Sequence, residues 1–513
     1  MPILATLALW LGFFPSQQRA LGTVRFPTSC AAAVRPRFNR GMALLHSFAF
    51  APAVDTFQAV LRADPRCAMA WWGLALTAWG NPFAAGIKPP AQLQRGLDAV
   101  QHARSTGGPT PRERGYIDAV ARLYEGADSL DQPARLLAYR DAMAALAARE
   151  PADTEAQILH ALALAVSADP ADKSYASQLA AGATLERLFA KLPDHPGLAH
   201  YIIHSYDVPP LAGRARRAAD RYSRIAPEVS HALHMPSHTY TRVGDWSRSI
   251  AANVAAGEAA RREQATAEAL HALDYRTYAY LQTGQDSAAA RMMAEVPALA
   301  ERLDPNAVGT GAPAAAGYFA IAAIPARFAL ERGDWAAAAR LEPRPSPFPF
   351  AVATTWFARG LGAARGGDTT AAAAAVAALR RLHDLLLQAG EAYWSEQVEI
   401  QRRAVSAWLA FAEGRREEAL EAMREAADRE AATEKNAITP GPLAPARELL
   451  GELLLAAGRP AAALAAFEQT LQHEPNRFRA LAGAASAAAA AGDSARAGKY
   501  RAELRRLAPH RMP

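Results

Sequence analysis

The sequence predicts an all-α fold, a right-handed superhelical solenoid of about nine to eleven antiparallel helix hairpins. Alanine-rich segments with a helical apolar period recur along the chain, and short Gly-Asp, Gly-Arg or Asp-Pro breaks separate them. Segments with the alternating pattern of β-strands are nearly absent. Because stacked repeats grow as one body, most of the 513 residues are expected to form a single solenoid, over residues 36–508.

The chain begins with a candidate export signal. An apolar run starts at Ile3 and ends at Pro15, and small residues follow it. This length suits a secretory signal peptide and is too short to cross a bilayer, although the usual basic residues before the run are missing. We therefore expect a signal peptide over residues 1–22, an N-terminal segment over residues 23–35, and a periplasmic or secreted mature protein without a membrane span.

The chain has two cysteines, Cys30 and Cys67. In an exported protein such a pair most simply forms a disulfide, which here would tie the N-terminal segment to the first helical hairpin. The alternative is a pair of buried thiols, and the sequence alone leaves both open.

Charge and motifs exclude several functional classes. The formal net charge is +6, but the arginines are spread along helices and are not gathered into a basic stripe interleaved with aromatic residues. We therefore expect no nucleic-acid partner. The sequence also has no glycine-rich phosphate loop, G-x-S-x-G elbow or H-E-x-x-H helix, so nucleotide-driven chemistry and serine hydrolysis are not expected.

The repeat unit is clearest near the C-terminus, in "PARELLGELLLAAGRPAAALAAFEQTLQHEPN". Gly451 and Ala463 would let the two helices of a hairpin approach closely. Phe467 would fill the space beside them, and Pro475 would end the second helix. These places and their spacing resemble the tetratricopeptide repeat, a two-helix unit of about 34 residues. Residues 444–508 are expected to form regular repeats of this kind.

The same pattern occurs at the other end of the solenoid, where the equivalent places are held by Gly41, Ala53, Phe57 and Pro65. The chain therefore resembles the tetratricopeptide-repeat superfamily over most of its length. It also resembles a group of secreted bacterial repeat proteins of unassigned function in the segments "GTVRFPTSC", "HSF", "AHYIIHSYD", "HALHMPSHTY" and "ITPGPLAPARELLGE". That second resemblance implies export and no particular reaction.

Histidines gather in the middle of the chain. Seven of the 13 lie in a histidine-rich region, residues 195–285, and the segment "SHALHMPSHTY" alone carries three of them. His200 and His234 are one repeat length of 34 residues apart, and so are His204 and His238. These histidines therefore recur at equivalent places of successive repeats.

The resemblance implies that these places lie on the first helix of each hairpin and face the concave side of the superhelix. Three successive first helices would then present His200, His204 and Asp207, next His231, His234 and His238, and next His271, Asp274 and Tyr278. Packed helices lie about 8–10 Å apart, so imidazoles from neighbouring helices can reach one ion. The set is large enough for two ions.

The expected metal ligands are the six histidines of this set, His200, His204, His231, His234, His238 and His271. Neutral imidazole is the commonest ligand of zinc and copper, which makes these the expected metals. Two other interpretations stay open. The imidazoles could stack on and hydrogen-bond a peptide or acidic ligand without metal, or they could simply pack within the solenoid.

Several other side chains are candidates for the concave groove. They are Tyr278, Arg327, Glu448, Glu452, His46 and Trp72. In a superhelix that completes about one turn, the two ends can approach the middle and enclose the histidines. Such enclosure would exclude water and strengthen electrostatic interactions at the site.

The sequence favours a binding module over an enzyme and leaves the choice open. As a module, the exported solenoid would use its groove and metal site to bind a peptide, a partner protein or a small molecule. As a metal-dependent enzyme, it would be a zinc hydrolase or a copper oxidase, with Asp274 or Asp207 as the base. A third possibility is metal storage or delivery.

Overall fold

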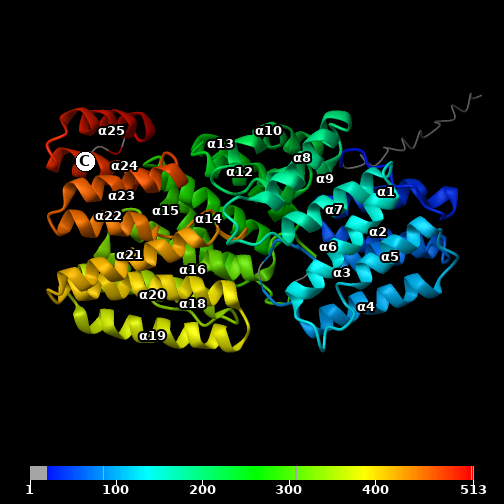
Figure 1. Ribbon diagram of the computed structural model, residues 1–513, viewed down its shortest axis with the longest axis horizontal. Coiled ribbons are helices and arrows are strands. Elements are labelled where there is room, and N and C mark those ends of the chain that lie inside the picture. The colour runs from blue at the N-terminus through cyan, green and yellow to red at the C-terminus, as the bar shows by residue number, and fades with distance from the viewer. Residues whose placement is uncertain (1–19, 85, 307–308, 510, 512–513) are drawn as a thin grey trace, which may run out of the picture.

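The computed structural model describes residues 20–84, 86–306, 309–509 and 511 (Figure 1). These residues form 25 α-helices and two short 3-10 helices, and no β-strand is found among them. Consecutive helices pack as antiparallel hairpins. Helices α11 (Ser230–His234) and α12 (Pro236–Arg242) are two halves of one helix that is interrupted before Pro236, so the helices form twelve hairpins. The predicted all-α fold of stacked, tetratricopeptide-like hairpins is confirmed, with one hairpin more than the upper end of the expected range.

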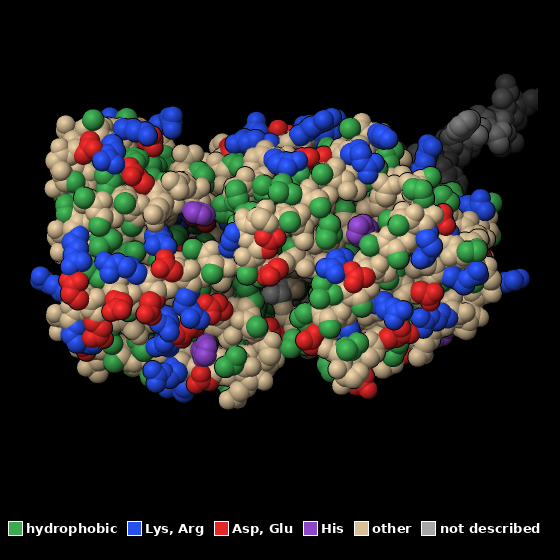
Figure 2. Space-filling model, viewed as in Figure 1, with side chains coloured by type: hydrophobic (Ala, Val, Ile, Leu, Met, Phe, Trp, Pro, Cys, Tyr) green, Lys and Arg blue, Asp and Glu red, His purple; other side chains and the backbone are tan. Residues whose placement is uncertain are grey.

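The surface carries charges of both signs. Figure 2 shows one face of the molecule, on which the basic and acidic side chains are interspersed and few histidines are visible. The six histidines expected to bind metal are all buried, and none is more than 8 % exposed. The imidazole-rich part of the sequence therefore lies inside the solenoid.

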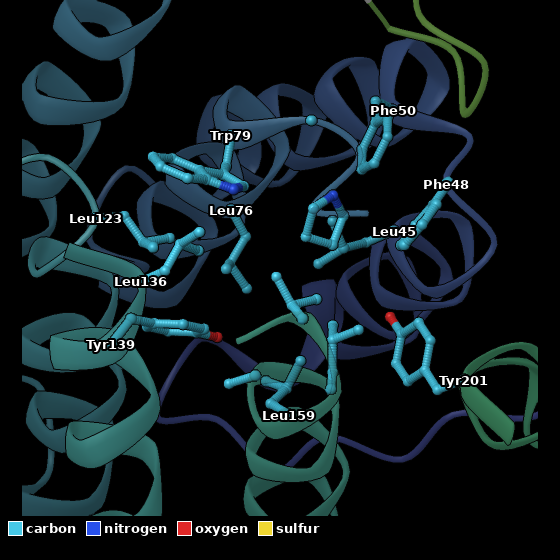
Figure 3. Close-up of a pocket in the computed structure, with 15 residues that line it drawn as sticks. Leu45, Phe48, Phe50, Leu76, Trp79, Leu123, Leu136, Tyr139, Leu159 and Tyr201 are labelled. Atoms are coloured by element: carbon cyan, nitrogen blue, oxygen red, sulfur yellow. The ribbon is translucent and has the colours of Figure 1, made fainter. Parts of the chain in front are cut away.

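The first eight helices form the right-hand part of Figure 1, in blue and cyan. After the 3-10 helix η1 (Ala32–Val34) they are α1 (Arg35–His46), α2 (Phe50–Ala63), α3 (Ala68–Trp79), α4 (Pro90–Ser105), α5 (Pro111–Ala121), α6 (Gln132–Arg149), α7 (Thr154–Val166) and α8 (Ala176–Lys191). Their buried side chains share one core that runs on to Tyr240, and part of this core lines an apolar cavity (Figure 3). The first hairpins and the first histidine-bearing helices are thus one packed unit.

The middle helices, green in Figure 1, carry the six histidines. Besides α11 and α12 they are α9 (Pro196–Ser205), the 3-10 helix η2 (Ala212–Ala215), α10 (Arg216–Ile225), α13 (Trp246–Arg262), α14 (Thr266–Gln282), α15 (Asp286–Ala300) and α16 (Ala314–Leu330). Helix α12 contacts α9, and α11 contacts α14. The first helices of three successive hairpins therefore lie side by side, as the repeat spacing predicts.

The last nine helices form the left-hand part of Figure 1, from yellow to red. They are α17 (Trp335–Ala339), α18 (Pro349–Arg365), α19 (Thr369–Gln388), α20 (Ala392–Ala412), α21 (Arg416–Ala432), α22 (Ala446–Ala456), α23 (Pro460–His473), α24 (Phe478–Ala490) and α25 (Ser494–Leu507). A second hydrophobic core, from Ala312 to Leu504, joins them. The regular repeats expected over residues 444–508 correspond to α22 through α25.

The glycines of the repeat pattern make room for aromatic rings. A Cβ atom at Gly451 would lie 2.9 Å from the ring of Phe467, and one at Gly483 in the next hairpin would lie 2.4 Å from it. At the other end of the solenoid, a Cβ at Gly41 would lie 2.8 Å from the ring of Phe57. Such distances leave no space for a methyl group, so each ring fits between first helices because glycine faces it. The steric roles predicted for Gly451 and Phe467 are confirmed.

The C-terminal repeats return to the middle of the molecule. Trp246 Nε1 donates a hydrogen bond to Asn476 O at 2.9 Å, and Arg477 Nη1 donates to the Tyr278 hydroxyl at 2.8 Å. These contacts join the turn between α23 and α24 to α13 and α14. The expected approach of the chain end to the middle is therefore present, and it closes the concave side over the histidine-bearing helices.

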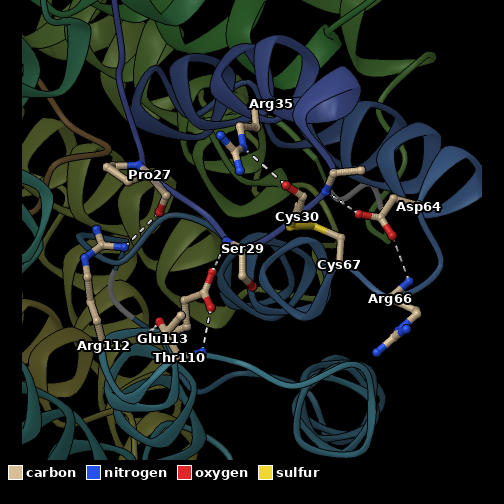
Figure 4. Close-up of a disulfide and its surroundings, with 11 residues drawn as sticks. Pro27, Ser29, Cys30, Arg35, Asp64, Arg66, Cys67, Thr110, Arg112 and Glu113 are labelled. Atoms are coloured by element: carbon tan, nitrogen blue, oxygen red, sulfur yellow. Dashed lines mark hydrogen bonds between the residues drawn. A yellow bond between two sulfur atoms is a disulfide. The ribbon is translucent and has the colours of Figure 1, made fainter.

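The disulfide expected from the sequence is present. Cys30 and Cys67 are bridged across 37 residues, with Cα atoms 4.7 Å apart (Figure 4). Around the bridge, Ser29 N donates to Glu113 Oε1 at 2.6 Å and Ala31 N donates to Asp64 Oδ2 at 2.8 Å. The N-terminal segment is thereby tied to α5 and to the corner between α2 and α3.

Breaking this disulfide is expected to destabilise the N-terminal hairpins. In the chain-entropy view, closing a loop of 37 residues stabilises the folded state by about 3–4 kcal/mol, although native-state strain can reduce this figure. A Cys30→Ser, Cys67→Ser variant should therefore lose up to about that free energy of unfolding. Denaturant titration of the variant beside the oxidised wild-type protein measures the difference. An unchanged midpoint and slope would contradict a stabilising role for the bridge.

Most of the expected signal peptide, residues 1–22, lies outside the described residues. At its expected end, Leu21 is buried and packs into the first core. Thr23 N donates to Asp194 O at 2.9 Å. The folded body therefore begins at or before Leu21, slightly ahead of the expected boundary. Among the described residues, no helix combines the length and apolar character needed to cross a bilayer.

Candidate metal centre

The structure brings the six predicted histidine ligands together in two groups of three. The first triad consists of His200, His204 and His231, and the second triad consists of His234, His238 and His271. Within each triad the three candidate ligand atoms lie within 4.8 Å of one another. All six side chains are buried, so they do not line an open groove. The predicted convergence is present, and the expected solvent-facing groove at these residues is not.

The two triads are neighbours. The ring centroids of His204 and His238 are 5.9 Å apart, and those of His231 and His234 are 6.3 Å apart. Each of these pairs joins the first triad to the second. The six rings therefore form one continuous cluster with room for two separate points of convergence.

In the second triad two ring nitrogens face each other at close range. His234 Nε2 and His238 Nε2 lie 3.0 Å apart. His234 donates from Nδ1 to Asn253 Oδ1 at 2.7 Å. The amide orientation of Asn253 is fixed because its Nδ2 donates to Ser249 O at 2.8 Å. His234 therefore carries its proton on Nδ1, and its Nε2 presents a lone pair toward His238.

His238 is oriented in the same way by Asp207. Its Nδ1 donates to Asp207 Oδ2 at 2.8 Å, and Lys435 Nζ donates to the same oxygen at 2.7 Å. Burial opposes the charge of this carboxylate, but Lys435, His238 and Arg242 outweigh burial and hold the pKa of Asp207 well below its ordinary value. An ionised carboxylate can only accept, so His238 Nε2 also presents a lone pair. The close contact of the two Nε2 atoms is repulsive unless a cation lies between them.

The first triad offers ring nitrogens without a protein hydrogen-bond partner. His200 Nδ1 donates to the backbone oxygen of His46 at 2.7 Å, which leaves a lone pair on Nε2. Within the six-histidine cluster, the buried ring nitrogens without a hydrogen-bond partner among the described residues are His200 Nε2, His204 Nε2, both nitrogens of His231 and, in the second triad, His271 Nδ1. Glu268 Oε1 lies 3.4 Å from His231 Nδ1, but without hydrogen-bond geometry. Each unsatisfied buried nitrogen costs about 1–3 kcal/mol, a cost that a bound ion would remove.

Burial keeps these imidazoles neutral. It lowers the pKa of four of them well below the ordinary value, and the neighbouring imidazoles add to the effect: His200, His204, His234 and His271. Burial also lowers the pKa of His238 to about 4, although Asp207 opposes it. Neutral imidazole is the form that binds a metal ion, so at pH 7 these rings are ready to do so.

The metal-free protein is expected to lose stability as the pH falls from about 6.5 toward 4. In the unfolded chain these histidines take up protons near pH 6.5, whereas in the folded chain the pKa of His238 is about 4 and the four others are also lowered. Unfolding therefore binds protons in this window, and by linkage the free energy of unfolding decreases as the pH falls. Denaturant titrations of chelator-treated protein at pH 7.5, 6 and 5 would measure this. Equal free energies at all three values would contradict the buried, neutral state of the cluster.

The segment between α21 and α22, residues 433–445, lies over the second triad, and we call it the strap. Tyr275, whose hydroxyl lies 3.3 Å from His238 Nε2, donates its proton to Thr439 O of the strap at 3.0 Å. Lys435 of the strap donates to Asp207 at 2.7 Å. In the sequence, this proline-rich segment has the composition of a connector between repeats, and nothing in it shows that it covers the histidines.

Arg327 holds the strap in place through hydrogen bonds. Its guanidinium donates to Thr439 Oγ1, Gly441 O and Pro442 O at 2.9, 2.8 and 3.1 Å. Its Nε donates to Asp274 Oδ1 at 2.9 Å, and both side chains of this ion pair are fully buried. Burial raises the pKa of Asp274, although Arg327 opposes the shift. Asp274, a predicted base, and Arg327, a predicted groove residue, are therefore partners of each other under the strap.

The other predicted groove residues of the C-terminal half also form ion pairs. Arg477 joins Glu448, at 2.7 Å, to the hydroxyl of Tyr278, at 2.8 Å. Glu452 is held by Arg365 and Arg479. These side chains do not line an open groove, because the returning C-terminal repeats and the strap fill the concave side. Here the structure corrects the expectation of a free groove surface.

His46 and Trp72 lie in the N-terminal half. His46 Nε2 is 3.0 Å from Glu155 Oε2, and His195 Nε2 is 3.0 Å from Glu155 Oε1. The carboxylate thus accepts from both rings, while His195 Nδ1 has no hydrogen-bond partner among the described residues. The backbone oxygen of His46 accepts from His200 Nδ1. Trp72 is 1 % exposed and packs in the core with its ring centroid 5.2 Å from that of Tyr116, so it does not line the groove.

Sequence comparisons give no family for this chain. No family model matches it, and no curated protein matches it. Among solved structures it is similar to the APC/C hetero-tetramer Cut9-Hcn1, with 13 % identity, 93 % of this chain and 88 % of that chain covered, and a TM-score of 0.31. It is also similar to a human IFIT1 dimer with m7Gppp-AAAA, with 10 % identity, 81 % and 86 % coverage, and a TM-score of 0.35. Nothing about function follows from these values.

Proposed function

We propose that this chain is an exported, tetratricopeptide-like metalloprotein whose two histidine triads each bind a transition-metal ion, zinc or copper, and whose metal site serves the binding of a ligand or partner. The contact between His234 Nε2 and His238 Nε2 carries the proposal. Asn253 and Asp207 fix both Nδ1 protons, so the two facing nitrogens have no proton to share. A metal ion turns this repulsive contact into two coordination bonds.

The chemistry of the donors fits these metals. Both triads offer only imidazole nitrogens, which suit zinc and copper, whereas calcium and magnesium require oxygen ligands. At zinc–nitrogen distances of about 2.0–2.1 Å, tetrahedral ligand atoms lie about 3.4 Å apart. The more distant ligand atoms of each triad, which lie within 4.8 Å of one another, would have to approach, and the Nε2 atoms of His234 and His238, which are 3.0 Å apart, would have to separate slightly. The hydrogen bonds from His200 to a backbone carbonyl and from His238 to Asp207 are those that orient metal-binding histidines in proteins.

The buried position of the six histidines argues against a metal-free groove that binds a peptide through these rings. A groove that captures a peptide through imidazole rings must expose those rings, and here none of the six is more than 8 % exposed. A larger groove lies along the strap, and Lys435, Arg242 and Tyr175 are among its lining residues. Lys435 and Arg242 also bind Asp207, which orients His238. A peptide or partner protein bound in this groove would therefore contact the residues that position the second triad.

A metal-dependent enzyme is the second candidate. Catalytic zinc sites keep three protein ligands and one open position, and each triad offers three imidazoles. A metal bound there would supply Lewis-acid or redox chemistry, as in a zinc hydrolase or a copper oxidase. Asp207 is poorly suited as the base, because three neighbours hold its charge and lower its pKa, and we assign it a positioning role. Asp274 retains one buried carboxylate oxygen without a hydrogen-bond partner among the described residues.

We place the protein in the periplasm or outside the cell. The Cys30–Cys67 disulfide supports this location, because disulfides persist in oxidising compartments and are rare in the cytosol. The apolar N-terminal run supports it as well. Fractionation of cells that express the full chain, followed by detection in periplasmic and cytosolic extracts, tests the location directly.

Elemental analysis tests the metal proposal. Protein produced without a histidine tag and passed through gel filtration is expected to carry about two zinc or copper ions per chain. A variant with both exposed histidines His102 and His473 replaced by alanine should carry the same amount, because these rings lie on the surface. Less than about half an ion per chain, even after exposure to divalent zinc or copper, would contradict the proposal.

A further inference from the structure

An apolar cavity lies beside the first triad, between the first two hairpins and helices α6, α7 and α9 (Figure 3). Its lining is formed mainly by leucines and aromatic rings, among them Leu45, Phe48, Phe50, Leu76, Trp79 and Tyr139. The space open to the centres of water molecules is about 50 Å³. That is room for about three or four waters, or for one small ring. Close-packed protein interiors rarely keep an apolar space of this size.

Phe48 separates this cavity from the first triad. Its ring lines the cavity, and its centroid lies 4.3 Å from that of His200, 5.5 Å from that of His231 and 6.0 Å from that of His204. Phe48 also has a φ of 52°, a left-handed conformation that is costly for a residue with a side chain. The chain thus holds this ring in a strained position between the cavity and the three imidazoles.

Two polar groups point into the otherwise apolar space. Figure 3 shows the indole nitrogen of Trp79 and the hydroxyl oxygen of Tyr139 on the cavity side of their rings. Trp79 is 4 % exposed and Tyr139 is 7 % exposed. Burial alone raises the pKa of Tyr139, with no contribution from a hydrogen-bonded neighbour. Buried Trp and Tyr donors ordinarily have a hydrogen-bond partner. An oxygen acceptor inside the cavity would supply one.

We infer that the cavity is the binding site for a small, mostly apolar molecule, about the size of one six-membered ring, that carries an acceptor oxygen. Its apolar body would contact the leucines and Phe50, and its oxygen would accept from Tyr139. Phe48 would then lie between this ligand and the first triad. This small molecule would be the ligand that the metal site serves, and in this respect the inference rests on the proposed function.

The cavity itself is tested on metal-free protein with two probes of equal size. Phenol carries an acceptor oxygen and toluene does not. Ligand-observed NMR titrations should show that Tyr139→Phe weakens phenol binding about threefold to tenfold, the effect of one hydrogen bond, and leaves toluene binding unchanged. Ala163→Leu replaces a methyl group on the α7 wall of the cavity by a larger side chain that would fill the cavity, so it should abolish binding of both probes. Phenol and toluene binding that neither variant changes would overturn the cavity assignment.

The position beside the metal is tested with cobalt(II) alone, whose visible absorption reports its coordination. Phenol should shift the absorption of the cobalt-loaded protein, and the shift should require higher phenol concentrations in Tyr139→Phe. Phenol binding that leaves the cobalt spectrum unchanged would overturn the link between cavity and metal. Absence of cobalt binding together with the expected probe titrations would overturn the metal proposal and support the cavity assignment, so the two failures are distinguishable.

Discussion

Replacing His234 and His238 by alanine is expected to leave about one metal ion per chain where the wild-type protein binds about two. These two rings supply the facing Nε2 atoms of the second triad. His271, the third ring of that triad, offers too few bonds to hold an ion by itself. The first triad keeps its three rings and its hydrogen bond to the His46 backbone. Elemental analysis of the tag-free variant measures the loss.

The matched control for this variant removes two histidines that lie outside the cluster. His102→Ala, His473→Ala changes the same number of imidazoles, but both of these rings are exposed and donate only to the preceding turn of their own helices. The control should keep the full metal content. Equal metal content in the two variants would show that the second triad does not bind the metal. Circular dichroism of both variants would confirm that the helices are retained.

The positions of the metal-site histidines could be predicted because they depend on repeat geometry. His200 and His234, one repeat apart, must occupy equivalent places on neighbouring first helices whatever the details of packing. The structure places them on α9 and α11, which belong to successive hairpins. The same reasoning could not assign the partners that fix their tautomers. Asn253 lies on the second helix of a hairpin, and no local pattern distinguishes it from other polar residues there.

The repeat pattern could not predict whether the concave side of the solenoid is open or filled by other parts of the chain. The pattern says which face of a first helix points inward, and Arg327 and Glu448 do point inward. Whether that space is open depends on contacts between residues more than one hundred positions apart, such as Arg327 with Thr439 and Arg477 with Tyr278. The strap also reads as a simple connector in the sequence, because proline and glycine suit loops of every kind. The open groove was therefore the natural expectation, and it is wrong for these residues.

Arg327→Ala is expected to destabilise the protein by about 3–5 kcal/mol and to free the strap. The substitution leaves the fully buried carboxylate of Asp274 without its cation and removes three hydrogen bonds to the strap. Denaturant titration measures the loss of stability. Limited proteolysis should then cleave the variant within residues 433–445, where the wild-type protein is held by these contacts.

Two comparisons separate the loss of the ion pair from a general packing defect. Burial already raises the pKa of Asp274, and without Arg327 this pKa should rise further, so the folded variant prefers a protonated carboxyl group. A raised folded-state pKa adds stability at low pH that is lost as the pH rises, so the variant should be destabilised more at pH 8 than at pH 5. Adding Asp274→Leu to Arg327→Met removes both charges and should recover much of the stability, because a paired apolar replacement leaves no buried charge. A double variant as unstable as Arg327→Ala, with a loss of stability relative to the wild-type protein that is equal at pH 5 and pH 8 in both variants, would mean that side-chain volume rather than charge holds the strap over the second triad.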